Sequence, residues 1–168
     1  MPVQPWNLDK IIDDIDEFLD AVLDTAGLDL DYEIREGGGD SAELISPDLT
    51  VDFSGDDLPQ LLDRHAELLL ALEHLTLEAL KISHDDRYRL LFDADDYRVA
   101  RIEELRMSAE AAAEKVAKSG RPFHFQPMTS RERRILHLTL RDNKEVMTTS
   151  EGMAYGRHTV IYKADKKP

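Results

Sequence analysis

Basic side chains are concentrated in one short stretch of this chain, SRERRILHLTL at residues 130–140. Arg133 and His137 are four residues apart, and Arg141 follows four residues later, so a helix beginning near Ser130 would place all three on one face. Guanidinium groups offer forked donors, and a helix N-terminus adds positive potential, which together suit phosphate. The expected phosphate-binding residues are Arg133, His137, Arg134, Arg141 and Arg157.

The sequence RHTVIYK, residues 157–163, supports this interpretation because it is typical of a strand. Alternation would place Arg157, Thr159 and Lys163 on one side of that strand. We expect this side to be largely polar and to extend the basic surface.

Catalysis has less support around His137. No serine, aspartate or second histidine stands at a spacing typical of a catalytic triad or a metal site, and the chain has no cysteine. We expect no enzymatic activity, no cofactor and no metal. Two alternatives stay open: ordinary ion pairs of Arg133 and His137 with Glu132, Asp142 or the acidic part of the chain, and a hydrolase centred on His137 with Asp142 or Glu132.

Charge is divided unevenly along the 168 residues. The net charge is −14, of which residues 1–119 contribute −19 and residues 120–168 contribute +5. Opposite charges in two parts predict two modules, 1–119 and 120–168, and a screening length of about 8 Å lets the basic one act locally. No apolar run is long enough for a membrane span and no secretion signal is evident, so we expect a cytoplasmic protein without membrane insertion.

Hydrophobic periodicity and turn residues predict an α+β fold. In the first module the expected elements are a helix from Leu8, capped by Asn7 and ending before Gly27, strands at 28–34 and 49–53, a loop at 36–48 between them, helical segments at 56–62 and 66–80, a strand at 88–94 and a helix from Asp95 to about Lys118. In the second module they are strands at 122–128, 145–152 and 157–164, with a helix from Ser130 introduced by the capping box Thr129 and Glu132.

Arg133-x-x-x-His137, framed by PMTSRERRILHL and followed by SEG and RHTVIY, resembles a small module that binds single-stranded nucleic acid, the Arg-x-x-x-His domain. The stretches LTVDFSGDDLPQLLDRHAELLLALEHL, YRLLFDADDYR and KSGRPFHFQPM resemble the KH domain that precedes this module in the bacterial Jag family, also called KhpB. The resemblance implies a cytoplasmic protein that binds single-stranded RNA, or less readily single-stranded DNA. It also implies post-transcriptional, cell-envelope, division or sporulation control, and a second small KH-domain protein as partner.

One stretch departs from the KH pattern. KH domains hold the RNA backbone with a G-x-x-G loop, and the corresponding residues here are Asp63, Arg64, His65 and Ala66. Asp63 places negative charge where phosphate would lie, and neither Asp63 nor Ala66 has the conformational freedom of glycine. Arg64 and His65 remain available to RNA, but we expect this module to bind RNA weakly or to act as a scaffold.

A different class of function therefore stays open. The acidic KH-like module would be a protein-interaction domain, and the chain an adaptor or a homodimer whose complex forms without RNA through the apolar surface of residues 45–119. We expect no separate N-terminal Jag module, because the helix from Leu8 leads almost directly into the KH-like sequence.

Overall fold

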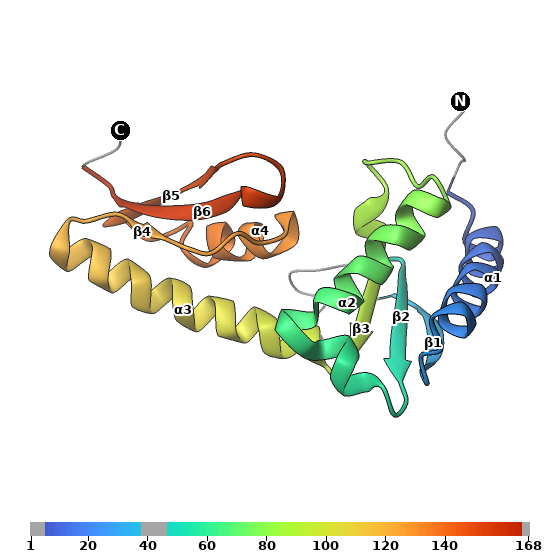
Figure 1. Ribbon diagram of the computed structural model, residues 1–168. Helices are drawn as coiled ribbons and strands as arrows, with labels where there is room; N and C mark the ends of the chain where they lie inside the picture. The colour runs from blue at the N-terminus through green and yellow to red at the C-terminus, as the bar shows by residue number, and fades with distance from the viewer. Residues whose placement is uncertain (1–5, 38–46, 166–168) are drawn as a thin grey trace. The chain divides into compact units, whose positions relative to one another are not determined.

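The computed structural model describes residues 6–37 and 47–165 (Figure 1). Packing divides the chain into a first unit, Met1–Arg98, and a second unit, Val99–Pro168. Each unit combines helices with a three-stranded sheet, which confirms the α+β class. Most of the predicted loop at 36–48 lies outside the described residues. Within the described ranges no helix has the length and apolar composition of a membrane span.

The first unit contains α1 (Leu8–Ala26), β1 (Asp31–Glu36), β2 (Leu49–Ser54), α2 (Leu58–Ala79), a 3₁₀ turn at Arg87–Arg89 and β3 (Leu90–Ala94). The sheet order is β1-β2-β3, with β1 antiparallel and β3 parallel to β2 (Figure 1). A parallel pair requires a crossover, and α2 supplies it. The predicted order of elements is confirmed for this unit.

Helix α1 begins and ends where its capping residues require. The Asn7 side chain accepts a hydrogen bond from the Lys10 backbone N–H, and Gly27 adopts a left-handed φ of 65° while its N–H bonds to Asp24 and Leu23. Four apolar residues at helical spacing are buried against the sheet unit: Ile11, Ile15, Leu19 and Leu23. This buried stripe leaves the aspartates of α1 on the outer side.

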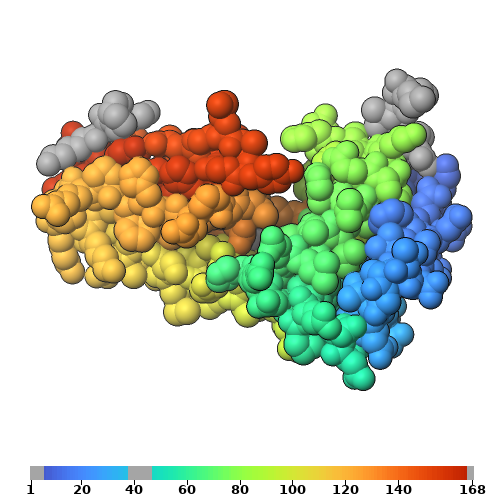
Figure 2. All heavy atoms as spheres, viewed as in Figure 1, coloured from blue at the N-terminus to red at the C-terminus, as the bar shows by residue number. Residues whose placement is uncertain are grey.

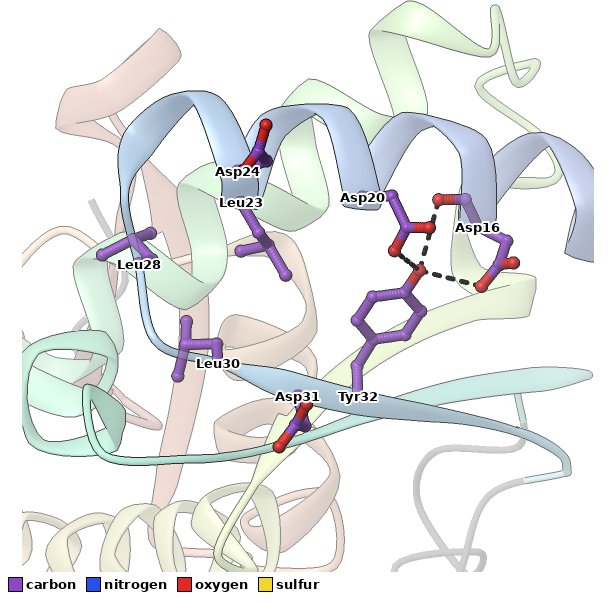
Figure 3. Close-up of a pocket in the computed structure, with 8 residues that line it drawn as sticks. All are labelled: Asp16, Asp20, Leu23, Asp24, Leu28, Leu30, Asp31 and Tyr32. Atoms are coloured by element: carbon purple, nitrogen blue, oxygen red, sulfur yellow. Dashed lines mark hydrogen bonds between the residues drawn. The ribbon is translucent and has the colours of Figure 1, made fainter.

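Tyr32 joins β1 to α1 at the edge of an acidic pocket (Figure 3). Its hydroxyl lies 2.7 Å from a carboxylate oxygen of Asp20 and 2.8 Å from one of Asp16. Burial, together with these two hydrogen bonds, raises the pKa of the phenol above its ordinary value, so the hydroxyl stays protonated and keeps donating. The pocket has a volume of about 560 Å³ and is lined by Asp16, Asp20, Leu23, Asp24, Leu28, Leu30, Asp31 and Tyr32.

Helix α2 is interrupted at the loop that the sequence places between two helices. Arg64, His65 and Ala66 have φ values of 52°, 61° and 59°, the left-handed region that costs a residue with a side chain about 1–2 kcal/mol. Packing holds the loop in place, since Ala66 is fully buried and the Tyr97 hydroxyl donates to the His65 carbonyl at 2.8 Å.

The second unit contains most of α3 (Tyr97–Ser119), then β4 (Phe123–His124), α4 (Ser130–Thr139), β5 (Val146–Glu151) and β6 (His158–Lys163). Its sheet order is β4-β6-β5, and both pairs are antiparallel. Strand β4 is shorter than the predicted strand at 122–128, whereas α4 starts at the predicted residue.

Packing places the boundary between the units in the first turn of α3, between Arg98 and Val99, whereas the charge changes after residue 119. The apolar residues buried along α3, including Leu105 and Val116, are not in the hydrophobic cluster of the first unit. Residues 99–119 contain as many acidic as basic residues, so the second unit has a net charge of +5 and the first −19 with either boundary. Because residues 99–119 are neutral overall, charge alone could not assign them to a unit.

Gly55→Ala should destabilise the first unit by about 2–4 kcal/mol, because the new Cβ would lie 2.5 Å from the Asp29 carbonyl oxygen at a φ of +125°. Gly27→Ala is the matched control: its φ is also positive, but nothing surrounds the added Cβ, so we expect about 1 kcal/mol. Urea unfolding followed by Trp6 fluorescence measures both, since this single tryptophan packs on the core of the first unit. Equal losses of unfolding free energy in the two variants would contradict the close approach of Gly55 to the Asp29 carbonyl.

Candidate nucleic-acid interface

Glu132 fixes the N-terminus of α4. Its carboxylate accepts hydrogen bonds from the Thr129 backbone N–H at 2.8 Å and the Thr129 hydroxyl at 2.9 Å, and the Glu132 N–H bonds back to that hydroxyl. The other carboxylate oxygen accepts from Arg101 Nε of α3 at 2.8 Å. The predicted capping box is therefore confirmed, and it is joined to a second helix by an ion pair whose side chains are only 12% and 16% exposed.

The environment of Glu132 keeps it ionised. Burial alone would raise the pKa of this carboxyl, but the hydrogen bonds from Arg101 and Thr129 outweigh burial and hold the pKa below its ordinary value. Its charge is thus used within the fold, one residue before Arg133.

His137 links α4 to β5. Its Nδ1 lies 2.6 Å from the Thr148 hydroxyl and its Nε2 lies 2.9 Å from the Ser150 hydroxyl. Burial, and then the charge of Arg133, lower the pKa of the ring below its ordinary value. The ring is therefore neutral at pH 7, with one nitrogen donating to a hydroxyl and the other accepting from one.

Two buried polar atoms beside this histidine have no hydrogen-bond partner within the described residues. Ser150 is paired in register with Thr159 of β6, so the two side chains lie on the same face of the sheet. Thr159 is fully buried and its Oγ1 is unpartnered, as is the buried Nε of Arg133. Buried polar groups normally have partners, so these two atoms are hydrogen-bonding groups whose capacity the described residues leave unused.

Positive charge at this site is not neutralised by the protein. Arg157, directly before β6, is exposed. Burial, and then the charge of Arg157, lower the pKa of Arg133. Neither guanidinium forms an ion pair with an acid in the described part of the chain. The Met128 N–H bonds to the Arg157 carbonyl at 3.2 Å, which brings Arg157 beside the start of α4. We define the Arg–His site as Arg133, His137, Thr148, Ser150, Arg157 and Thr159.

The other predicted basic residues lie elsewhere. Arg134 is exposed on α4. The prediction that Arg141 shares the helical face of Arg133 and His137 is wrong, because α4 ends at Thr139 and Arg141 follows it, exposed and 3.6 Å from the carboxylate of Asp142. The helix ends there because the Asn143 N–H turns back to the Leu140 carbonyl.

The predicted polar side of β6 is also wrong. Thr159 and Ile161 are both fully buried, so the middle of this side is packed, and only its two ends, Arg157 and Lys163, reach solvent. The alternation of residues along a strand does not distinguish an exposed polar residue from a buried one, and Thr159 is polar yet fully buried.

The loop at Asp63–Ala66 gives no comparable surplus of positive charge. The Asp63 carboxylate accepts from the Arg64 backbone N–H at 2.9 Å. The Arg64 guanidinium lies 3.8 Å from Asp63 and 4.0 Å from Glu67, and both ion pairs are highly exposed. His65 is exposed and Ala66 buried, so Arg64 and His65 are the loop side chains that face solvent along with Asp63.

Sequence reasoning missed the hydroxyl partners of His137. Thr148 and Ser150 alternate along β5, which puts both on one face of the strand. In the sequence TTSE, residues 148–151, this alternation of hydroxyl residues is the one feature that could have indicated the partners of His137. It indicates a site only when α4 is known to cross β5.

The arrangement has limited catalytic potential. A Ser150–His137 pair has the geometry of a nucleophile and base, but Thr148 supplies a hydroxyl at Nδ1 where a catalytic triad has a carboxylate. Glu132 is engaged with Arg101, and Asp142 lies beside Arg141. Within residues 6–37 and 47–165, no three histidine, aspartate or glutamate side chains gather as a metal site. An oxyanion held by two arginines fits these residues better.

Residues 103–163 match the R-three-H domain, which is the Arg-x-x-x-His module named for an arginine and a histidine separated by three residues. The RNA-binding protein KhpB of Clostridium symbiosum is 30% identical over 145 residues, which cover 86% of this chain and 63% of that protein. The chain belongs to the KhpB family. The Bacillus subtilis (strain 168) RNA-binding protein KhpB is 34% identical over 111 residues, 65% of this chain and 53% of that protein. The Lactiplantibacillus plantarum KhpB is 29% identical over 137 residues, 82% of this chain and 39% of that protein.

The matched Arg-x-x-x-His domain contains the whole Arg–His site. It also includes most of α3, which agrees with the packing boundary rather than with the boundary set by charge. The chain spans less than two thirds of each of these three KhpB relatives.

Glu132→Gln should destabilise the second unit by about 2–4 kcal/mol at pH 7, because it leaves Arg101 without its buried partner. Since the pKa of Glu132 is lowered on folding, its contribution is complete above about pH 4.3 and is lost as the pH falls through the lowered pKa. The stability difference between wild type and variant should therefore shrink in acid. Urea unfolding followed by the methyl NMR signals of Ile135 and Ile161 measures it.

Glu104→Gln is the control for this prediction. Glu104 also contacts Arg101, at 2.7 Å, but its side chain is 56% exposed. We expect a cost below about 1 kcal/mol. Similar costs for both variants would show that the buried pair does not anchor α4.

Proposed function

We propose that this chain binds single-stranded RNA and that the Arg–His site holds the phosphate backbone. The observation that supports this most directly is the state of Arg133. Among residues 6–37 and 47–165, its buried Nε has no hydrogen-bond partner and no acid pairs with its guanidinium, while the charge of Arg157 opposes it. A phosphate between the two guanidiniums would supply the missing acceptor and remove their repulsion. The family match and the RNA-binding relatives favour RNA, and single-stranded DNA is the competing ligand to test.

His137 has a positioning role in this proposal. Both of its ring nitrogens are engaged by Thr148 and Ser150, so the neutral ring fixes these hydroxyls beside the arginines. A bound phosphate would favour the protonated ring, because a nearby anion raises the pKa of a histidine. RNA binding should accordingly take up protons and strengthen as the pH falls from 7 towards 5.5.

The wider role follows from the same proposal. We infer a non-enzymatic, cytoplasmic protein that acts on transcripts after their synthesis, in control of the cell envelope or of division, with a second small KH-domain protein or another copy of itself as partner. The KhpB relatives support the RNA component of this role, and their greater length leaves room for activities beyond those of this chain.

Arg133→Ala should weaken binding to a single-stranded RNA about tenfold, because it removes a charge-assisted contact to phosphate. Three phosphate contacts give a slope of about −2 for the logarithm of affinity against the logarithm of salt concentration, and losing one should reduce the slope by about 0.7. Fluorescence anisotropy at several salt concentrations measures both quantities.

Arg141→Ala is the matched control, since it removes the same charge from an exposed residue beyond α4. We expect less than a twofold change. Equal losses of affinity in the two variants would mean that binding depends on net charge and not on the Arg–His site. Because we propose no enzymatic activity, the RNA should remain intact after incubation with either variant or with wild type.

A second function is favoured by the first unit. Its −19 charge and the neutralised Arg64 disfavour phosphate, so we propose that this KH-like unit mainly contacts protein. Asp63→Gly with Ala66→Gly would restore G-x-x-G, and it should raise RNA affinity several-fold by removing a carboxylate and allowing backbone approach. Asp13→Asn, an exposed change of the same charge on α1, should leave affinity unchanged. An unaltered affinity in the double variant would show that the missing glycines are not what limits RNA binding by this unit.

A further inference from the structure

Two large apolar side chains are almost fully exposed in the turn between β5 and β6. Tyr155 is 94% exposed and Met153 87%, the highest values among the large hydrophobic residues described. In Figure 2 the residues of β5, β6 and their connecting turn form part of the visible surface of the second unit. Neither side chain contributes to a core, so folding of the unit does not account for them.

Backbone hydrogen bonds fix the conformation of the turn that carries these two side chains. The Gly156 N–H bonds to the Met153 carbonyl at 3.1 Å and the Arg157 N–H bonds to the Ala154 carbonyl at 3.2 Å. The strands close so tightly that a Cβ at Gly152, where φ is +85°, would lie 2.6 Å from the Gly156 carbonyl oxygen. Such a turn leaves the backbone at Tyr155 little conformational entropy to lose on binding, so the cost is confined to the side chain.

The turn leads directly into the Arg–His site. Tyr155 is two residues before Arg157, so their Cα atoms are at most about 7.6 Å apart. In a single strand each base is joined to its phosphate through one sugar. A nucleotide whose phosphate lies at Arg157 and Arg133 therefore has its base within reach of the Tyr155 ring.

We propose that Tyr155 is a base-stacking platform for the nucleotide whose phosphate occupies the Arg–His site. This inference rests on the proposed function and adds the means by which the site selects unpaired nucleotides. Aromatic rings stack on any base, but a base within a duplex has both faces covered by its neighbours. The phosphate contacts alone would accept a duplex, whereas the tyrosine requires a base with a free face. Met153 is the other exposed apolar residue of this turn.

The test compares the wild-type 168-residue chain with Tyr155→Ala, Tyr155→Phe and Tyr88→Ala. Tyr88 is a matched control because it is 62% exposed and lies in the first unit. Each protein is titrated by anisotropy with a short single-stranded RNA and with the same oligonucleotide made fully abasic. A third RNA containing 2-aminopurine reports stacking through quenching of its fluorescence.

We expect Tyr155→Ala to weaken binding to the base-bearing RNA about tenfold, to leave the abasic strand unaffected and to abolish the added quenching. Tyr155→Phe should retain binding, because the ring remains, and Tyr88→Ala should match wild type. If wild type binds RNA and loses affinity with Arg133→Ala but not with Tyr155→Ala, the stacking role is overturned and the phosphate site stands. If wild type binds no RNA, both proposals fail. If Tyr155→Ala instead changes the sedimentation of the protein without RNA, the ring contacts another copy of the chain and the stacking role is overturned.

Discussion

The orientation of the Glu132 carboxylate is the constraint on which the second unit depends. Glu132 precedes Arg133 in the sequence, but neighbouring side chains on a helix do not face each other. Its carboxylate accepts two hydrogen bonds from Thr129 and one from Arg101, which cap α4 and attach it to α3. One acid therefore fixes the start of the helix that carries Arg133 and His137, and also attaches this helix to α3. The position of the Arg–His site depends on this use of Glu132 in the fold.

A second constraint is the neutral state of His137. A protonated imidazole beside Arg133 and Arg157 would add a third positive charge to a partly buried site, and burial already opposes it. The neutral ring instead exchanges hydrogen bonds with two hydroxyls of β5, which sets the separation of α4 from the sheet. The histidine of the Arg-x-x-x-His pattern thus has two roles. It holds α4 against β5 through its hydrogen bonds, and its pKa depends on the charge of Arg133.

The sequence was most informative where local chemistry determines structure. Asn7, Gly27 and the pair Thr129 and Glu132 predicted helix ends correctly, since capping involves residues only a few positions apart. The break at Asp63–Ala66 was also placed correctly, although three left-handed residues without glycine are held there by packing. The sequence was less informative about contacts between elements. Arg141 follows the helical repeat but lies past the end of α4, and the role of Ser150 becomes evident only from the crossing of α4 over β5.

If phosphate supplies the missing partner of Arg133, the NMR signal of the Arg133 Nε–H group should respond when single-stranded RNA is titrated in. We expect a large downfield proton shift and slower exchange with water for this group, together with a smaller change at Arg157, while the exposed Arg64 and Arg141 signals stay in place. An unchanged Arg133 signal at saturating RNA, with shifts confined to Arg64 and its loop, would move the RNA site to the first unit and leave Arg133 without a role in binding.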